Sequence, residues 1–140
     1  MDTSSLDIEQ KMQSAQEFWG APLPDQLTEL IRENPSQYIY NCPYVNWTDI
    51  LVYFTIQVQV FEGLTFHGKA GGLGLYEDET TSGILMTDDK DKLYHETKTF
   101  IIAEGPAYYT VSFFNGLTNL GHVFVKTGMM ALAAGSGSWS

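Results

Sequence analysis

Charge is scarce in this sequence, and most of it has one sign. Charged residues make up 17% of the 140 residues, and 17 acidic against 7 basic side chains give a formal net charge of −10. Without a basic stripe, phosphate neutralisation cannot drive binding to nucleic acid, and capture by anionic lipid is disfavoured for the same reason. The composition therefore excludes nucleic acid as an expected partner.

Cysteine and long apolar runs are nearly absent as well. Cys42 is the one cysteine, so no internal disulfide can form and the fold must depend on packing. No run of roughly 18 apolar residues occurs, which predicts that the chain has no transmembrane helix. Residues 1–10 lack the basic start and the apolar stretch of a signal peptide. We expect a cytoplasmic protein, or a secreted one if a leader has been removed.

The residues before position 45 show helical periodicity. One apolar stripe recurs every three to four residues over 4–19, at Ile8, Met12, Ala15 and Trp19. Gly20 is expected to end this helix. A shorter helix is predicted over 25–33, and Asn34-Pro35 ends it. Residues 36–48 are rich in Tyr and Trp but lack a clean period.

From residue 50 onward the period becomes two. Val52, Phe54, Ile56, Val58 and Val60 alternate with polar residues, which predicts a half-buried strand with these five side chains facing inward. Further short strands are predicted, separated by turn sequences such as Asn115-Gly116, around 62–67, 70–76, 82–87, 97–103, 107–114, 119–126 and 128–134.

Eight short strands without intervening helices predict an all-β fold, an eight-stranded antiparallel barrel with a short N-terminal helical segment. The predicted organisation is a helical segment over 1–45, which packs on the barrel or extends from it, and a β-barrel domain over 46–140. Closure hides the strand edges, which matters because 44% of the residues are hydrophobic. The terminal GSGSWS is expected to be a loose tail, which Trp139 could hold against the barrel.

An ordered series of short motifs runs through the predicted barrel. The series comprises Ala70 to Leu75 (AGGLGL), Gly83, Leu85, Thr87-Asp88-Asp89, Leu93-Tyr94, Thr97, Phe100, Tyr108, Val111, Phe113-Phe114, Leu120-Gly121-His122 and Gly135 to Trp139. In order and spacing, this series resembles the virulence-associated protein (Vap) family of rhodococci over about residues 50–140. The resemblance implies an eight-stranded barrel with a filled interior and no known enzymatic activity. It also implies secretion and an association with phagosomal membranes, although this chain shows no signal peptide and its N-terminal part is helical.

No constellation of residues predicts catalysis or a bound metal. His67, His95 and His122 are not at metal-ligand spacings, and Cys42 has no partner, so neither a metal nor a cofactor is expected. The acidic run from Asp88 to Lys92 lacks the spacing of a calcium loop, and a solvated turn with Asp88 or Asp89 capping backbone amides is expected. AGGLGL lacks the context of a phosphate-binding loop.

Two functions remain open at the level of the sequence. The favoured hypothesis is a non-enzymatic binding or interaction module that acts on a partner protein or a lipid surface. The alternative is a small barrel enzyme, of cyclase or isomerase type, that shapes a hydrophobic small molecule; the surplus of aromatic residues and the lack of a secretion signal motivate it. If a pocket exists, Tyr53, His67 and His122 are the residues expected to contact a ligand.

Overall fold

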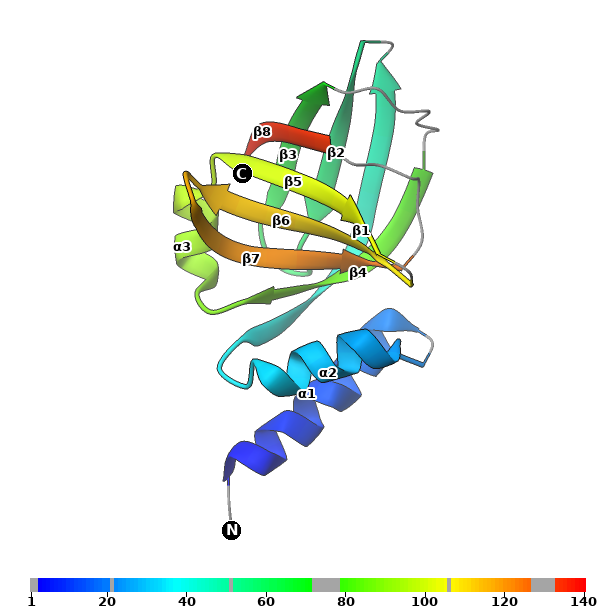
Figure 1. Cartoon of the computed structure of the whole chain (residues 1–140), viewed down its shortest axis with the longest axis vertical. Helices are drawn as coiled ribbons and strands as arrows, with labels where there is room; N and C mark the ends of the chain where they lie inside the picture. Colours follow the sequence, from blue (N-terminus) through cyan, green and yellow to red (C-terminus); the bar gives the residue numbers. More distant parts are fainter. Residues whose placement is uncertain (1–2, 21, 51, 72–78, 106, 127–132) are drawn as a thin grey trace.

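The computed structural model describes residues 3–20, 22–50, 52–71, 79–105, 107–126 and 133–140. Its strands form one closed antiparallel barrel in the order β1-β2-β3-β8-β5-β6-β7-β4 (Figure 1). The strands are β1 (Tyr38–Ile50), β2 (Tyr53–Gln59), β3 (Thr65–Gly71), β4 (Glu79–Thr87), β5 (Thr99–Glu104), β6 (Tyr109–Asn115), β7 (Thr118–Val125) and β8 (Ala133–Trp139). The predicted fold class, an eight-stranded antiparallel barrel with an N-terminal helical region, is confirmed.

Strand β1 is one of the elements that the sequence did not predict. It spans residues for which no period was found, and the predicted boundary at residue 45 falls inside it. The reason is a register shift between Cys42 and Val45 in its pairing with β4. Cys42, Val45 and Trp47 are buried, so the inward positions are separated first by three residues and then by two. This irregularity removes the alternation by which a strand is recognised.

The predicted inward set of the first strand is confirmed except at its start. Phe54, Ile56, Val58 and Val60 are at most 1% exposed, whereas Val52 is 82% exposed. Val52 precedes β2 in the turn from β1, and its backbone N–H donates to the carbonyl of Ile50 at 2.7 Å. The expectation that Val52 points into the barrel is therefore wrong, because the alternation begins only where β2 does.

Two further strand assignments need correction. The strands predicted at 62–67 and 70–76 correspond, within the described residues, to the single strand β3, and residues 72–76 lie outside the description. Of the strand predicted at 128–134, residues 133 and 134 belong to β8, and the rest lies outside the described residues. The other predicted strands agree with β4, β5, β6 and β7 to within a few residues.

The C-terminal GSGSWS is part of the barrel and not a loose tail. It forms most of β8, which pairs with β3 on one side and with β5 on the other. A side chain at Gly135 would collide with the backbone oxygen of Lys69, and one at Gly137 with that of His67. The glycines therefore allow β8 to approach β3 closely, and Trp139, 7% exposed, joins the interior.

Helices α1 (Thr3–Trp19) and α2 (Asp25–Glu33) cover the outer surface of one side of the barrel, where β4 and β7 run (Figure 1). Both helices match the predicted ranges closely. The predicted stripe of α1 packs here, and α2 contributes Leu27 and Ile31 to the same cluster. Gly20 has a φ of +74° and its N–H donates to the carbonyl of Gln16 at 3.0 Å, so it ends α1 as predicted.

A third helix, α3 (Lys90–Glu96), replaces the solvated turn that was predicted for the acidic run. Asp89 is its N-cap and accepts a hydrogen bond from the N–H of Lys92 at 3.1 Å, as was expected of Asp88 or Asp89. Leu93 is fully buried, and the ring of Tyr94 lies 5.1 Å from that of Trp139. Helix α3 therefore packs its apolar side against one end of the barrel interior.

Candidate functional site

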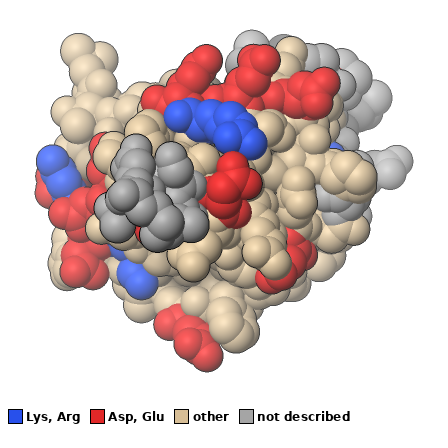
Figure 2. All heavy atoms as spheres, turned by 90° about the horizontal axis from the view of Figure 1, so that it is seen from below, with Lys and Arg blue, Asp and Glu red and all other residues tan. Residues whose placement is uncertain are grey.

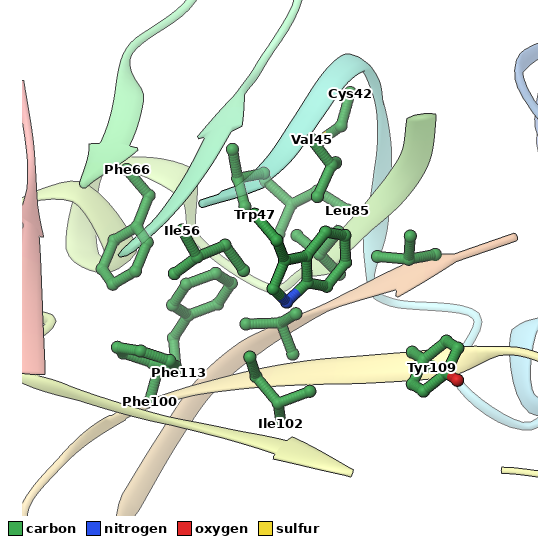
Figure 3. Close-up of a cluster of buried hydrophobic side chains, with 14 of the residues drawn as sticks. Cys42, Val45, Trp47, Ile56, Phe66, Leu85, Phe100, Ile102, Tyr109 and Phe113 are labelled. Carbon is green, nitrogen blue, oxygen red and sulfur yellow. The ribbon is translucent and has the colours of Figure 1, made fainter. Parts of the chain in front are cut away.

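The barrel interior is filled by large side chains (Figure 3). The ring of Phe66 lies 4.9 Å from that of Phe113 and 5.4 Å from that of Phe100, with edge-to-face angles of 72° and 81°. Trp47 and Phe54 are also at most 1% exposed. These side chains occupy the space that a ligand inside the barrel would need, so candidate sites are to be sought on the outer surface.

The three residues predicted to contact a ligand do not form one site. Tyr53 and His67 lie on the outer faces of the neighbouring strands β2 and β3, and the Nζ of Lys69 lies 3.9 Å from the centre of the Tyr53 ring. His122 lies on the outer face of β7, which is four strands away from β3 in either direction around the barrel. The structure therefore separates His122 from the other two.

His122 is half-buried and contacts one polar and one aromatic side chain. Its Nδ1 lies 2.8 Å from the hydroxyl oxygen of Ser112, which sits directly opposite on β6. Its ring also lies 6.0 Å from that of Phe124. Burial lowers the pKa of His122 below its ordinary value of 6.5, so the imidazole is neutral at pH 7. A neutral imidazole can offer one donor and one acceptor, and one of these is engaged by Ser112.

A groove of about 310 Å³ opens beside His122, between the C-terminal end of α2 and the outer faces of β6 and β7. We call it the α2 groove; its lining residues are Leu30, Asn34, Tyr108, Thr110, His122 and Phe124. The rings of Tyr108 and Phe124 meet edge to face at 5.5 Å. Burial raises the pKa of Tyr108, so its hydroxyl also stays neutral. None of the six lining residues carries a charge at pH 7, which is consistent with an apolar ligand.

A second hollow lies where β1 begins and α3 starts. Tyr38 and Tyr40 line it together with the acidic run from Asp88 to Asp91, and its volume is about 330 Å³. The Nζ of Lys90 already lies 4.8 Å from the centre of the Tyr40 ring. Burial, with the nearby Tyr38 and the carboxylates of Asp91 and Asp89, raises the pKa of Tyr40. Lys90 therefore already makes the cation–π contact that the Tyr40 ring could otherwise offer to a ligand in this hollow.

The described residues give no support for metal binding, for a reactive thiol or for a membrane-spanning helix. Among them, no group of three or more His, Cys, Asp or Glu side chains is placed to hold a metal ion. Cys42 is completely buried, and burial raises the pKa of its thiol, which therefore stays protonated and unreactive. Within the same residues, no helix is both long and apolar enough to cross a membrane.

The sequence identified His122 but missed its neighbours in the α2 groove. Phe124 stands between the inward-facing Val123 and Val125, so it has to point outward, where an aromatic side chain is unexpected on a water-facing strand. The uninterrupted apolar run from Val123 to Val125 could have indicated that the outer face of this strand is covered. The contribution of α2 could not be found in the same way, because nothing local indicates which strands a helix covers.

Comparisons with known proteins agree with this architecture. The family model described as Rhodococcus equi virulence-associated protein matches residues 7–140. The chain belongs to this family. The resemblance that the sequence predicted over about residues 50–140 is confirmed, and it extends over the helical segment. No curated protein matches.

Two solved structures of Vap proteins have the same fold. Virulence-associated protein VapB from R. equi is 29% identical, with a TM-score of 0.68 over 74% of this chain and 97% of that chain. VapD from R. equi is 28% identical, with a TM-score of 0.67 over 74% of this chain and 98% of that chain. The shared part is about as long as the barrel, so these Vap structures support the barrel fold.

Proposed function

We propose that this Vap-family chain is a non-enzymatic binding module that holds an apolar group of a partner protein or of a lipid surface on the outside of its barrel. The observation that carries the proposal is the contrast between a filled interior and an uncharged groove on the outer surface. Binding sites for small apolar groups are concave and lined by apolar and aromatic side chains with few polar groups. The α2 groove has these properties, with His122 and Thr110 as its polar members on the sheet.

Charge disfavours an anionic partner surface. The net charge of −10 repels anionic lipid and anionic polypeptides, and Figure 2 shows acidic side chains, with basic ones between them, on the face that is seen from below the helices. The residues that line the α2 groove carry no charge, so recognition in the groove has to come from apolar contact and hydrogen bonds. The cytoplasmic location expected from the sequence stays a prediction, as does the identity of the partner.

The enzyme alternative receives less support. A cyclase or isomerase of this size would enclose its substrate, and the inward-facing positions are occupied by aromatic and branched side chains. Tyr53, His67 and His122, the polar contacts that this alternative would use, are not brought together. We therefore develop the binding module alone.

The proposal is tested with a pair of matched threonine-to-arginine substitutions. Thr110 lines the α2 groove on β6, while Thr99 is exposed on the outer face of the adjacent strand β5. Thr110→Arg places a long cation in the groove, and Thr99→Arg adds the same charge outside it. The probes are Nile red, an uncharged apolar dye, in a fluorescence titration, and phosphatidylcholine vesicles in a flotation assay.

We expect wild type and Thr99→Arg to bind Nile red, the vesicles or both, and Thr110→Arg to lose at least most of that binding. Circular dichroism and thermal unfolding show whether both variants keep the barrel. Equal binding by the two variants, or no binding of either probe by the wild type, contradicts the proposal. Mass spectrometry of the recovered dye checks that the bound molecule is chemically unchanged.

A further inference from the structure

We propose that the α2 groove selects an uncharged lipophilic molecule that carries a hydrogen-bond acceptor such as a ketone, and that His122 Nε2–H donates to this acceptor. The inference rests on the proposed function and adds the chemical class of the ligand. It follows from two features of the groove: which atoms of His122 are already engaged, and which charges are missing from the lining.

The hydrogen bond between Ser112 and His122 engages Nδ1, and we assign Ser112 as its donor. The Ser112 hydroxyl can donate to Nδ1, and the neutral ring then carries its proton on Nε2. Protonation at Nε2 is also the more stable form of a free neutral imidazole side chain. In this tautomer Nε2, the ring nitrogen that Ser112 does not engage, offers a donor and not an acceptor to a ligand.

The lining distinguishes uncharged ligands from charged ones. Of its six residues, only His122 and Tyr108 titrate, and burial keeps both neutral. A carboxylate would find no cation among these six residues, and an ammonium group would find no carboxylate. Burying either ion without a partner is unfavourable, whereas a neutral carbonyl loses little when one N–H replaces water.

The apolar part of such a molecule has a surface to contact. Leu30 and Tyr108 are half-buried and line the groove, while Phe124, 2% exposed, lies beneath them with the Tyr108 ring edge-on to it. An alkyl chain along these three side chains places its polar end at His122. One N–H of the Asn34 side-chain amide donates to the carbonyl of Leu30 at 2.8 Å, which holds this amide at the end of α2.

The experiment compares three ten-carbon probes that differ in their polar end: decan-2-one, decanoate and decylamine. Binding at pH 7.5 is followed by NMR, through the backbone amides of Thr110 and His122 and the imidazole nitrogens. We expect decan-2-one to bind most tightly and to shift the groove amides. The nitrogen shifts should report the Nε2-protonated tautomer in the free protein.

His122→Phe keeps a ring and removes the donor, so its affinity for decan-2-one should fall about five-fold, as expected for one net hydrogen bond. His67→Phe is the matched control on the opposite side of the barrel and should bind like the wild type. Tighter binding of decanoate or decylamine, a protonated Nδ1, or an unchanged affinity of His122→Phe overturns the inference.

The two proposals can fail separately. If decan-2-one does not bind, while Nile red still binds in a manner that Thr110→Arg abolishes, the ligand class is wrong and the α2 groove remains the binding site. If the NMR shifts caused by decan-2-one map to residues outside the groove, the inference is likewise overturned.

Discussion

Strands β2 and β4 belong to the same barrel but differ in what covers their outer faces. In β2, buried Phe54, Ile56 and Val58 alternate with half-exposed polar residues, because the outer face meets water. In β4, residues 83–87 are all buried, because Leu85 faces the interior while Ile84 and Met86 pack under the helices. The local pattern therefore reports whether a strand is covered on one face or on both.

The molecule thus has two apolar clusters with different origins. The interior cluster draws on all the strands around the barrel, whereas the outer cluster joins α1 and α2 to β4 and β7. Losing a residue from the interior weakens the whole barrel, whereas losing one from the outer cluster loosens the helices first. The four predictions that follow test this difference, from the largest expected effect to the smallest.

Phe66→Ala should have the largest effect, because Phe66 contacts three aromatic neighbours in the interior. We expect the free energy of unfolding to fall by about 4 kcal/mol, as is typical for a buried Phe replaced by Ala. Urea unfolding followed by circular dichroism measures the change. Phe61→Ala is the control, because Phe61 is 61% exposed and should change stability by less than about 0.5 kcal/mol.

Leu27→Ala should cost about 2–3 kcal/mol within the outer cluster, where Leu27 is fully buried on α2. Amide hydrogen exchange should show lost protection in α1 and α2, with β2 and β3 unchanged. If protection falls equally in all strands, the two clusters are one cooperative unit. Leu117→Ala, at a fully exposed leucine in the β6–β7 turn, is the matched control.

Asp89→Ala should cost about 1 kcal/mol, because it removes the N-cap of α3. Asp88→Ala, an equal change of charge at the exposed neighbouring residue, should have a much smaller effect. Thermal unfolding of the two variants measures the difference. Equal melting temperatures would show that the cap contributes nothing to the closure of this end of the barrel.

The smallest effect concerns pH. Because burial lowers the pKa of His122 below 6.5, the unfolded chain takes up the proton first as pH falls. The folded state therefore loses stability as pH falls below 6.5, and the loss stops growing below the folded-state pKa. His122→Gln should lack this part of the pH dependence. We expect urea unfolding of the variant and wild type to diverge between pH 7.5 and 5.5.

The fold could be predicted from the sequence wherever the hydrophobic periodicity of a short segment determines its secondary structure. The stripe of α1, the alternation from Phe54 onward and the family motifs were sufficient for the barrel and for the N-terminal helices. Strand β1 escaped prediction because its register shift breaks the alternation, and β8 because glycines usually indicate a flexible tail. Both were missed because pairing between distant strands, and not the local sequence, determines them.

Only part of the candidate site could be predicted from the sequence. His122 was singled out, but so were Tyr53 and His67, and only the strand order shows that these lie on another side of the barrel. Ser112 and Thr110 are ordinary outward residues of a strand until β7 and α2 are placed beside them. The local sequence does not indicate which strands and helices lie side by side.

The position of β8 also constrains the order in which the barrel can assemble. Its neighbours β3 and β5 are separated by α3 and β4 along the chain, and β8 is the strand that joins them. Until residues 133–139 are in place, both neighbours present unpaired backbone groups to any other strand. During synthesis the nascent chain therefore carries two open edges until its last strand arrives, and this interval is when intermolecular association is most probable.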